Sequence, residues 1–161
     1  MHSEQKEVAQ KKTRECLGQR VTVAAMRTVL CHGVFDVLHI GHIRLLRHAS
    51  RLGDLLIVSL LADQWVRLYK RFDRPIHSLD ERIEQMRAIR YVDDIVVVDG
   101  PGHEAVQNMI KGVNPEVYVK GRGTKGTFGE EEWVRSRGIE MHFVDMEKVG
   151  DVEISSTRIL E

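Results

Sequence analysis

Residues 28–49, which read TVLCHGVFDVLHIGHIRLLRHA, decide the fold class because a strand pattern, a polar loop and a helix pattern follow one another. The apolar run 28–31 is typical of a short buried strand that ends at His32 and Gly33. Residues 41–49 place their apolar side chains at helical spacing, and Gly53 supplies a stop signal. The stretch therefore predicts a strand–loop–helix unit.

The same kind of unit recurs along the rest of the chain. Residues 55–61 form a nearly unbroken apolar run, as expected for a parallel strand that is covered on both faces. A polar connection over 64–77 leads to Ser78 and Glu81, whose spacing predicts a capping box that opens a helix to about Arg90. Further strands are predicted at 95–98, 117–119 and 139–144. Further helices are predicted at 103–111 and after residues 155–157. A second capping box, Thr127 with Glu130, predicts one more helix, which ends at Gly138.

Strands that alternate with helices predict an α/β fold. The expected architecture is a doubly wound (Rossmann-like) five-stranded parallel sheet, in a single domain over residues 28–161. Residues 1–20 favour an extra N-terminal accessory helix whose thin apolar stripe could pack on a partner subunit. Ligands of such sheets bind at the carboxyl ends of the strands, near the point where the strand order reverses, so we expect functional residues just after each strand.

Composition excludes several classes of protein. The 161 residues suit one domain, and 42% hydrophobic with 30% charged residues excludes collagen, low-complexity disorder and a disulfide-built miniprotein. Lys plus Arg and Asp plus Glu both number 24, so the basic footprint of a nucleic-acid-binding protein is missing and no nucleic-acid partner is expected. Any anion site must be a local pocket.

Cysteine usage and hydropathy predict a cellular compartment. Cys16 and Cys31 are too few for a disulfide framework. No apolar run approaches the roughly 18 residues of a membrane helix, and the charged start of the chain is unlike a signal peptide. These features predict a cytoplasmic protein with no membrane partner.

The loop over residues 33–42 is the densest polar cluster that follows a predicted strand. A helix N-terminus presents unpaired N–H groups there, and Gly41 lets phosphate oxygens approach the backbone. His39 and His42, three residues apart, can point to the same anion and stabilise charge that develops on a phosphorus atom. The alternatives are two exposed loop histidines or a His-x-x-His metal pair, although zinc needs further ligands at supporting spacing.

The pattern Gly33-x-Phe35-Asp36-x-x-His39-x-Gly41-His42 resembles the HxGH signature of the nucleotidyltransferase superfamily of cytidylyltransferases and their relatives. The resemblance covers about residues 28–161. It continues through Lys70, Arg74-Pro75-Ile76, Arg90-Tyr91-Val92-Asp93, Val119-Lys120-Gly121 and Ile154-Ser155-Ser156-Thr157.

The resemblance implies that a substrate phosphate attacks the α-phosphorus of a nucleoside triphosphate and that pyrophosphate leaves, normally with Mg²⁺ as cofactor. It implies a catalytic role for His39 and His42 at the triphosphate and for Lys70 as a cationic arm that closes over phosphates. The nucleotide-binding residues would be Gly33, Val34, Phe35, Asp36, Gly41, Lys120, Gly121, Arg122, Ile154, Ser155, Ser156 and Thr157. The residues that bind the second substrate would be Asp63, Arg74 and Arg90, and no metal ligands are assigned.

Asp36 and Lys70 also have structural interpretations. Asp36 could orient its loop through hydrogen bonds to backbone amides, or it could bind substrate or metal, and turn chemistry slightly favours the first. Lys70, near Arg71 and Arg74, could belong to an ordinary solvated charge cluster.

Two branches of the superfamily compete for the substrate assignment. Residues 90–94 are similar to cytidylyltransferases that act on glycerol phosphate, whereas Arg74-Pro75-Ile76 and Val119-Lys120-Gly121 resemble heptose-phosphate adenylyltransferases. The expected partners are therefore CTP or ATP, with a slight preference for CTP, and a phosphorylated polyol or sugar. A homodimer is expected. Gly150-Asp151-Val152-Glu153 departs from the Arg-x-x-Gly run of the cytidylyltransferases.

Other classes of function stay open at this point. Gly121-x-Gly123-x-x-Gly126 with Asp145 matches a dinucleotide-binding fingerprint, but it follows the fourth predicted strand, with one strand left after it. A non-catalytic nucleotide sensor could use the same pocket, and an interaction module would rest on the N-terminal helix alone.

Overall fold

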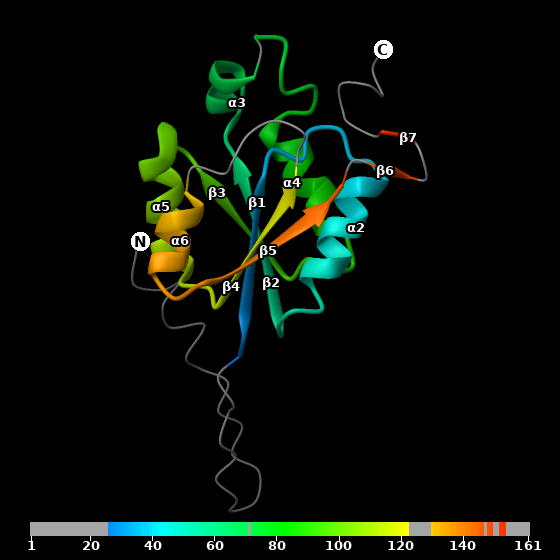
Figure 1. Cartoon of the computed structure of the whole chain (residues 1–161). Helices are drawn as coiled ribbons and strands as arrows, with labels where there is room; N and C mark the ends of the chain where they lie inside the picture. Colours follow the sequence, from blue (N-terminus) through cyan, green and yellow to red (C-terminus); the bar gives the residue numbers. More distant parts are fainter. Residues whose placement is uncertain (1–25, 71, 123–129, 147, 150–151, 154–161) are drawn as a thin grey trace, which may run out of the picture.

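The computed structural model describes residues 26–70, 72–122, 130–146, 148–149 and 152–153 (Figure 1). Three predictions lie outside these residues: the N-terminal accessory helix at 1–20, the capping role of Thr127 and the terminal helix after residues 155–157.

Five parallel strands form the centre of the protein, in the order β3-β2-β1-β4-β5. Each neighbouring pair in this sheet is parallel. The strands are β1 (Thr28–Gly33), β2 (Leu55–Leu61), β3 (Asp94–Val98), β4 (Val117–Arg122) and β5 (Glu140–Asp145). The structure thus confirms the predicted α/β class with a five-stranded parallel sheet.

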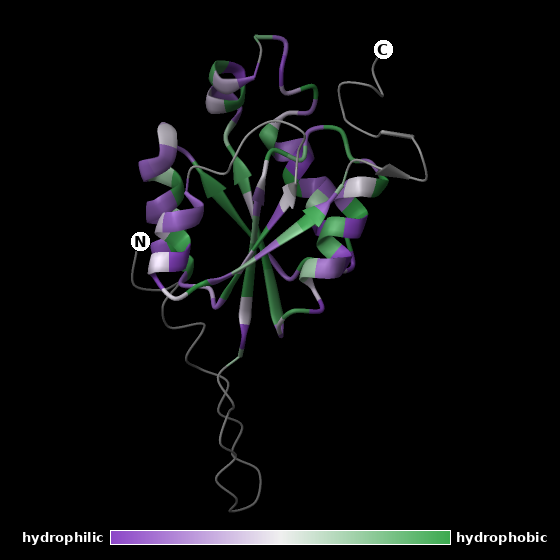
Figure 2. Ribbon diagram, viewed as in Figure 1, coloured by the Kyte–Doolittle hydropathy of each residue, from purple (hydrophilic) through white to green (hydrophobic). Residues whose placement is uncertain are grey.

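Helices cover both faces of the sheet, as Figure 1 shows. On one face pack α2 (Ile40–Ala49) and α4 (Leu79–Arg87), and on the other α5 (Gly102–Val113) and α6 (Glu131–Ser136). Figure 2 shows hydrophobic strands between helices that carry hydrophilic residues on their outer sides. Because both faces are covered, the strand sequences are almost continuously apolar.

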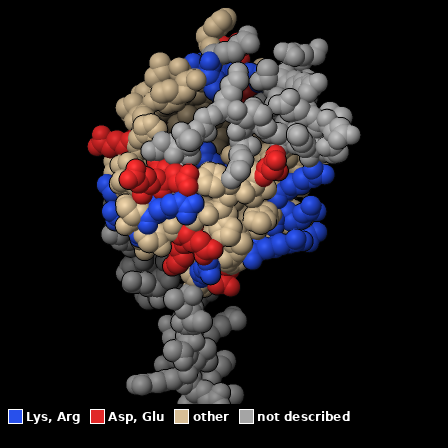
Figure 3. Space-filling view, viewed as in Figure 1, with Lys and Arg blue, Asp and Glu red and all other residues tan. Residues whose placement is uncertain are grey.

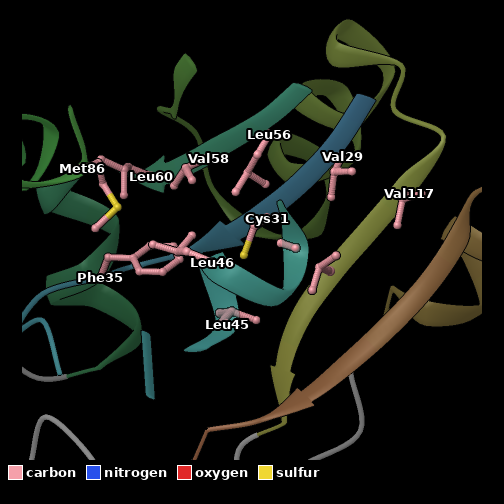
Figure 4. Close-up of a cluster of buried hydrophobic side chains, with 12 residues drawn as sticks. Val29, Cys31, Phe35, Leu45, Leu46, Leu56, Val58, Leu60, Met86 and Val117 are labelled. Carbon is pink, nitrogen blue, oxygen red and sulfur yellow. The ribbon is translucent and has the colours of Figure 1, made fainter. Parts of the chain in front are cut away.

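Two hydrophobic cores hold the layers together, one on each face. Figure 4 shows the first, in which Val29 and Cys31 of β1 meet Leu45 and Leu46 of α2. The second joins Leu30, the next residue of β1, to side chains of the opposite helices that include Ile110 and Val134. Each fully buried aliphatic side chain contributes about 1.5–3 kcal/mol to folding. Alternate residues of one strand therefore supply both cores.

The strand order reverses between β1 and β4. β1 leads through α2 to its neighbour β2, whereas β3 crosses through α5 on the opposite face to reach β4. The carboxyl ends of β1 and β4 consequently diverge at the topological switch point, where ligands of such sheets bind.

The connection after β2 differs from the prediction. Residues 64–77 were expected to be a polar connection, but Asp63–Tyr69 form the short helix α3. Only Val66 of this helix is fully buried, so its sequence carries too thin an apolar stripe to signal a helix. Trp65 Nε1 and Gln64 Nε2 both donate to Asp99 Oδ1, at 3.0 and 2.6 Å, which docks α3 against the end of β3.

The two predicted capping boxes have different outcomes. At α4 the Ser78 amide donates to the Glu81 carboxylate at 2.7 Å, and Ser78 Oγ accepts from the Glu81 amide, which confirms the first box. At α6 the described helix begins at Glu131, and its N-terminal cap, Glu130, makes no side-chain capping bond. The Glu130 carboxylate contacts His103 Nδ1 at 2.7 Å. Thr127, the other residue of the second box, lies outside the described residues, so this box stays a prediction.

Smaller differences concern element ends. α4 ends at Arg87 rather than near Arg90, and α5 is one residue longer at its start and two longer at its end than predicted. β4 continues through Lys120 and Gly121 to Arg122, which places these residues in a strand and not in the loop after it. The loop expected after β5 contains a short antiparallel pair, β6 (Lys148–Val149) and β7 (Val152–Glu153).

Surface charge is distributed in local groups. Figure 3 shows basic side chains gathered at the edge formed by α2, and acidic and basic side chains interleaved over the rest of the visible face.

Among the residues that the structure describes, no helix is long and apolar enough to span a membrane.

Candidate active site

The two histidines of the 33–42 loop lie together at the N-terminus of α2. Their ring centroids are 3.9 Å apart with an interplanar angle of 30°, and Phe35 packs 5.1 Å from the His42 ring. His39 is the N-terminal cap of the helix, so its extended backbone turns the chain out of β1 and into α2. The sequence therefore brings both imidazoles to the positive end of one helix.

Hydrogen bonds to the backbone orient both rings. His39 Nδ1 accepts from the Gly41 amide at 3.1 Å, and His42 Nδ1 accepts from the His39 amide at 3.4 Å. A ring nitrogen that accepts a hydrogen bond carries no proton, so in the neutral His39 imidazole the proton lies on Nε2. The His42 ring also hydrogen-bonds the Val37 backbone, an effect on its pKa that opposes burial.

Both histidines are neutral at physiological pH. Burial, together with the positive charges of His39 and Lys70, lowers the pKa of His42 to about 3. Burial also lowers the pKa of His39. Two neutral donors beside a helix N-terminus form a site that can hydrogen-bond phosphate oxygens.

Lys70 follows α3 and belongs to the same group of charges. Its backbone N–H donates to the Val66 carbonyl at 2.9 Å as the C-terminal cap of the helix. Desolvation lowers the pKa of Lys70, and the attraction of Asp36 opposes this effect. Since its charge acts on both His42 and Asp36, the structure brings the predicted cationic residue close to these two side chains.

Asp36 orients the loop through backbone amides, as the sequence favoured, but the amides belong to a distant segment. Its Oδ1 atom accepts from the amides of Ile76 and His77 at 2.7 and 2.9 Å, and its Oδ2 atom contacts Arg74 Nη1 at 3.2 Å. Burial raises the pKa of Asp36, but these hydrogen bonds outweigh it and hold the pKa below its usual value. The carboxylate thereby fastens the segment after Lys70 to the histidine loop.

Arg74, predicted to bind the second substrate, is held by this ion pair. Only 11% of its side chain is exposed. The guanidinium and the Asp36 carboxylate thus form one buried pair beside the histidines.

Met146 closes one side of the site, against two of the predicted glycines. A Cβ atom at Gly41 would overlap the Met146 carbonyl oxygen and the His39 ring, and a Cβ atom at Gly121 would overlap the Met146 side chain. Glycine is needed at position 41 because the Met146 main chain approaches so closely, whereas at position 121 the overlapping atoms belong to the flexible Met146 side chain. The space beside Gly41, which the sequence suggested for phosphate oxygens, is therefore occupied by backbone.

Gly33 and Phe35 shape the loop itself. Phe35 has a φ of 51°, and its ring lies against Gly33, where a Cβ atom would overlap it. Phe35 is buried in the core, so it anchors the loop and does not face solvent. Val34, between them, packs in the core of the opposite face.

Arg82 is a residue of the site region that the sequence analysis missed. Its side chain is fully buried, and it donates to the carbonyls of Val34, Leu61 and His77 and to Asp63 Oδ1. Asp63, predicted to contact substrate, is thus an ion-pair partner at 2.6 Å. The signal was present: Arg82 lies on the same helical stripe as the buried Met86, where a charge is unexpected.

The remaining predicted residues fall into three groups. Lys120 and Gly121 lie in β4 at the switch point, and burial lowers the pKa of Lys120. Arg122 ends the same strand. Arg90 is exposed, with its guanidinium 5.4 Å from the Tyr91 ring, and it precedes the start of β3, so the structure does not bring it to the histidines. Ile154, Ser155, Ser156 and Thr157 lie outside the described residues.

The described residues do not by themselves build a cation site. Among them, no group of three or more His, Cys, Asp or Glu side chains could hold a metal ion. The carboxylate of the histidine loop, Asp36, is already bonded to three donors. A protein-held Mg²⁺ therefore does not fit the described part of the site.

Several curated proteins are similar to this chain. It is 36% identical to the FAD synthase of Aciduliprofundum boonei over 83% of this chain and 87% of that protein, and 44% identical to the FAD synthase of Thermococcus kodakarensis over 58% and 60%. It is also 35% identical to the bifunctional protein HldE of Campylobacter fetus, over 66% of this chain and 23% of that protein. The chain thus spans less than two thirds of the last two relatives.

Solved structures and a family model agree with these similarities. A lipopolysaccharide core biosynthesis protein from Thermoplasma volcanium has 28% identity and a TM-score of 0.61, over 77% of this chain and 98% of that chain. A pantoate-beta-alanine ligase from Francisella tularensis, 15% identical with a TM-score of 0.57 over 84% of this chain and 66% of its own, shares the fold. The model of the family described as cytidylyltransferase-like matches residues 30–161, and the chain belongs to this family.

Proposed function

We propose that this protein transfers an adenylyl group from ATP to the phosphate of a phosphorylated polyol or sugar, with release of pyrophosphate. The observation that carries the proposal is the close pair of His39 and His42 rings at the N-terminus of α2, with the charge of Lys70 acting on His42. Imidazole groups at such a position can donate to phosphate oxygens and stabilise the charge that grows on them during phosphoryl-type transfer.

The chemistry requires positioning and charge neutralisation. An oxygen of the acceptor phosphate forms a bond to the α-phosphorus of the triphosphate, and the bond from that phosphorus to the bridging oxygen breaks. The electron pair of the broken bond leaves with pyrophosphate. In this scheme His39 and His42 donate to the α- and β-phosphate oxygens, while Lys70 neutralises charge on the leaving group. Mg²⁺ would enter with the triphosphate, since Mg²⁺ at nucleotide sites is held largely by substrate phosphates and water.

Relatives support ATP over CTP as donor. The FAD synthases carry a name that states an AMP-containing product. The similarity of residues 90–94 to cytidylyltransferases favours CTP, but it supports CTP less strongly than the relatives support ATP, because it rests on one short segment. Arg74-Pro75-Ile76 and Val119-Lys120-Gly121, which resemble heptose-phosphate adenylyltransferases, favour ATP as donor and a sugar phosphate as acceptor. We also propose that the protein is cytoplasmic and forms a homodimer.

A pyrophosphate-release screen tests the function. The full-length protein with Mg²⁺ is given each of four nucleoside triphosphates, crossed with glycerol 3-phosphate, ribose 5-phosphate, mannose 1-phosphate, a heptose 1-phosphate and flavin mononucleotide. The expected result is release with ATP and a hydroxyl-rich phosphate, with the adenylylated product identified by mass spectrometry. Tighter binding of CTP than of ATP in calorimetry would overturn the choice of donor. ATP binding without release from any acceptor would instead indicate a nucleotide sensor.

A further inference from the structure

The exposed apolar side chains of this protein are concentrated on α3 and the segment after it. Of the seven large apolar side chains that are exposed among the described residues, four lie within residues 68–76: Leu68, Tyr69, Phe72 and Ile76. Phe72 is 90% exposed. Figure 1 shows α3 and this segment projecting beyond the carboxyl ends of the strands. We name these four side chains the apolar arm.

A hollow of about 420 Å³ lies between the end of β3 and the outer side of α5. Most of its lining is apolar and comes from Val97, Pro101, Ala105 and Met109. Val97 is another of the seven exposed apolar side chains, and Glu104 adds a negative charge to the lining. We name this region the edge hollow, because β3 is an edge strand of the sheet.

The apolar arm and the edge hollow are neighbours on the surface. Trp65 of α3 donates to Asp99 in the lining of the hollow, and the amide of Gly102, the first residue of α5, donates to the Tyr69 hydroxyl. Because Phe72 is almost fully exposed, its ring does not fill the edge hollow of its own chain. A projecting apolar knob and an apolar hollow therefore lie side by side, and both are open to solvent.

A second copy of the chain is the partner that suits both features at once. Exposed apolar side chains that gather in one place mark an interaction surface. In a two-fold dimer, a contact from the arm of one copy to the hollow of the other is repeated in the opposite direction, so the assembly closes at two copies. Charge agrees with this pairing, because the exposed Arg67 of α3 would approach Glu104 of the partner's hollow.

We propose that the apolar arm of each copy docks in the edge hollow of a second copy, with Phe72 as the anchor of the interface. This inference rests on the homodimer of the proposed function and names the surface that forms it. Aromatic side chains are enriched at the centre of protein interfaces, and an aromatic anchor that enters a pocket supplies much of the binding free energy. Charges at the rim, such as Arg67, contribute to specificity more than to affinity.

The mass of the full-length protein in solution tests the interface. Sedimentation equilibrium without nucleotide should show a dimer for the wild-type chain. Phe72→Ser, which removes the anchor, and Ala105→Phe, which fills the hollow, should each raise the Kd of the dimer at least tenfold. Met26→Ser is the matched control, because Met26 is also exposed but precedes the amino end of β1, at the opposite end of the sheet. Its Kd should stay within twofold of the wild-type value.

Thermal melting and circular dichroism verify that each variant is folded. Since Phe72 is exposed in a single copy, Phe72→Ser should fold, and it carries the test if Ala105→Phe does not.

A mixture of the two variants tests whether the contacts are reciprocal. The Phe72→Ser copy keeps an open hollow, and the Ala105→Phe copy keeps its arm. A heterodimer therefore retains one complete contact between an arm and a hollow, whereas neither homodimer retains any. Mixing should raise the fraction of dimer above that of either variant alone at the same total concentration. Copies that bind through another surface would show no such gain, which would overturn the inference.

Other results would also overturn it. A rise of less than tenfold in the Kd of Phe72→Ser would place the interface elsewhere and leave the homodimer intact. A wild-type mass above two copies would contradict the reciprocal closure. A wild-type chain that is monomeric at every concentration would overturn this inference together with the homodimer. None of these outcomes bears on nucleotidyl transfer, because the pyrophosphate screen measures that reaction separately.

Discussion

The guanidinium of Arg82 donates to the Asp63 carboxylate at 2.6 Å, and the Arg82 side chain is completely buried. This ion pair joins α4 to the start of α3. The other donors of Arg82 reach the Val34 and Leu61 carbonyls, which directly follow β1 and end β2. One residue thereby ties together the segments that carry the histidine loop and Lys70.

Replacing Arg82 should strongly destabilise the protein. Arg82→Met removes the charge partner of Asp63 and leaves buried carbonyls without a donor, which typically costs about 3–5 kcal/mol for a broken buried pair. Urea denaturation measures the change in the free energy of unfolding. Arg87→Met, at an exposed position of the same helix, is the control and should change stability by less than about 0.5 kcal/mol. Equal stability of the two variants would contradict the role of Arg82.

Replacing His42 should remove catalysis and leave nucleotide binding. His42→Ala deletes one donor to the transition state, so kcat should fall by roughly 10² to 10³. The Kd for ATP should change little, and the fold should survive. His48→Ala, on the exposed side of the same helix, is the matched control. A kcat within threefold of the parent would remove the support for His42.

Lys70 should matter for activity more than for stability. Lys70→Ala removes positive charge beside the histidines, and because the side chain is exposed, the melting temperature should hardly move. A drop in kcat/KM of at least tenfold is expected in the pyrophosphate assay. Arg67→Ala, another exposed basic position of α3, should be close to the parent. A large shift in melting temperature with unchanged kcat/KM would mean that Lys70 is structural.

Mild acid should destabilise the fold through two histidines. The folded-state pKa values of His32 and His42 are about 4 and about 3, whereas an unfolded histidine has a pKa of about 6.5. Below that pH the unfolded chain binds more protons than the native one, so stability falls as the pH is lowered, by up to about 1.4 kcal/mol per pH unit for each histidine.

Urea denaturation at pH 7 and pH 5 measures this dependence. His42→Gln should lessen the loss of stability between the two values, whereas His48→Gln, at an exposed position, should leave it unchanged. A free energy of unfolding that rises on acidification would show that the histidines are not neutral in the native state.

Local sequence patterns predicted what depends on local interactions. The apolar run Leu55–Leu61 and the capping box at Ser78 and Glu81 depend on neighbours in sequence, and both are confirmed. The contact of Glu130 with His103 joins residues that are distant in sequence, so no local pattern predicts it. The amide partners of Asp36 lie about 40 residues away, and no spacing rule reveals them.

The pair of site histidines differs in the same way from three polar residues that lie side by side in the sheet. His39 and His42 share one helix turn, so their proximity follows from their spacing. His32, Ser59 and Lys120 meet only through the register of three strands and the order in which those strands pair. The sequence contained these residues but not their arrangement.

The contacts of Met146 limit which substitutions the candidate active site can accept. Positions 41, 121 and 146 come from three separate segments, and residue 146 limits what the other two positions can carry. A library that randomised position 41 alone would lose nearly all of its members, because any side chain there meets the Met146 carbonyl oxygen. Variants with a larger residue at position 121 should instead carry a smaller one at position 146, while position 41, which faces the main chain, stays fixed.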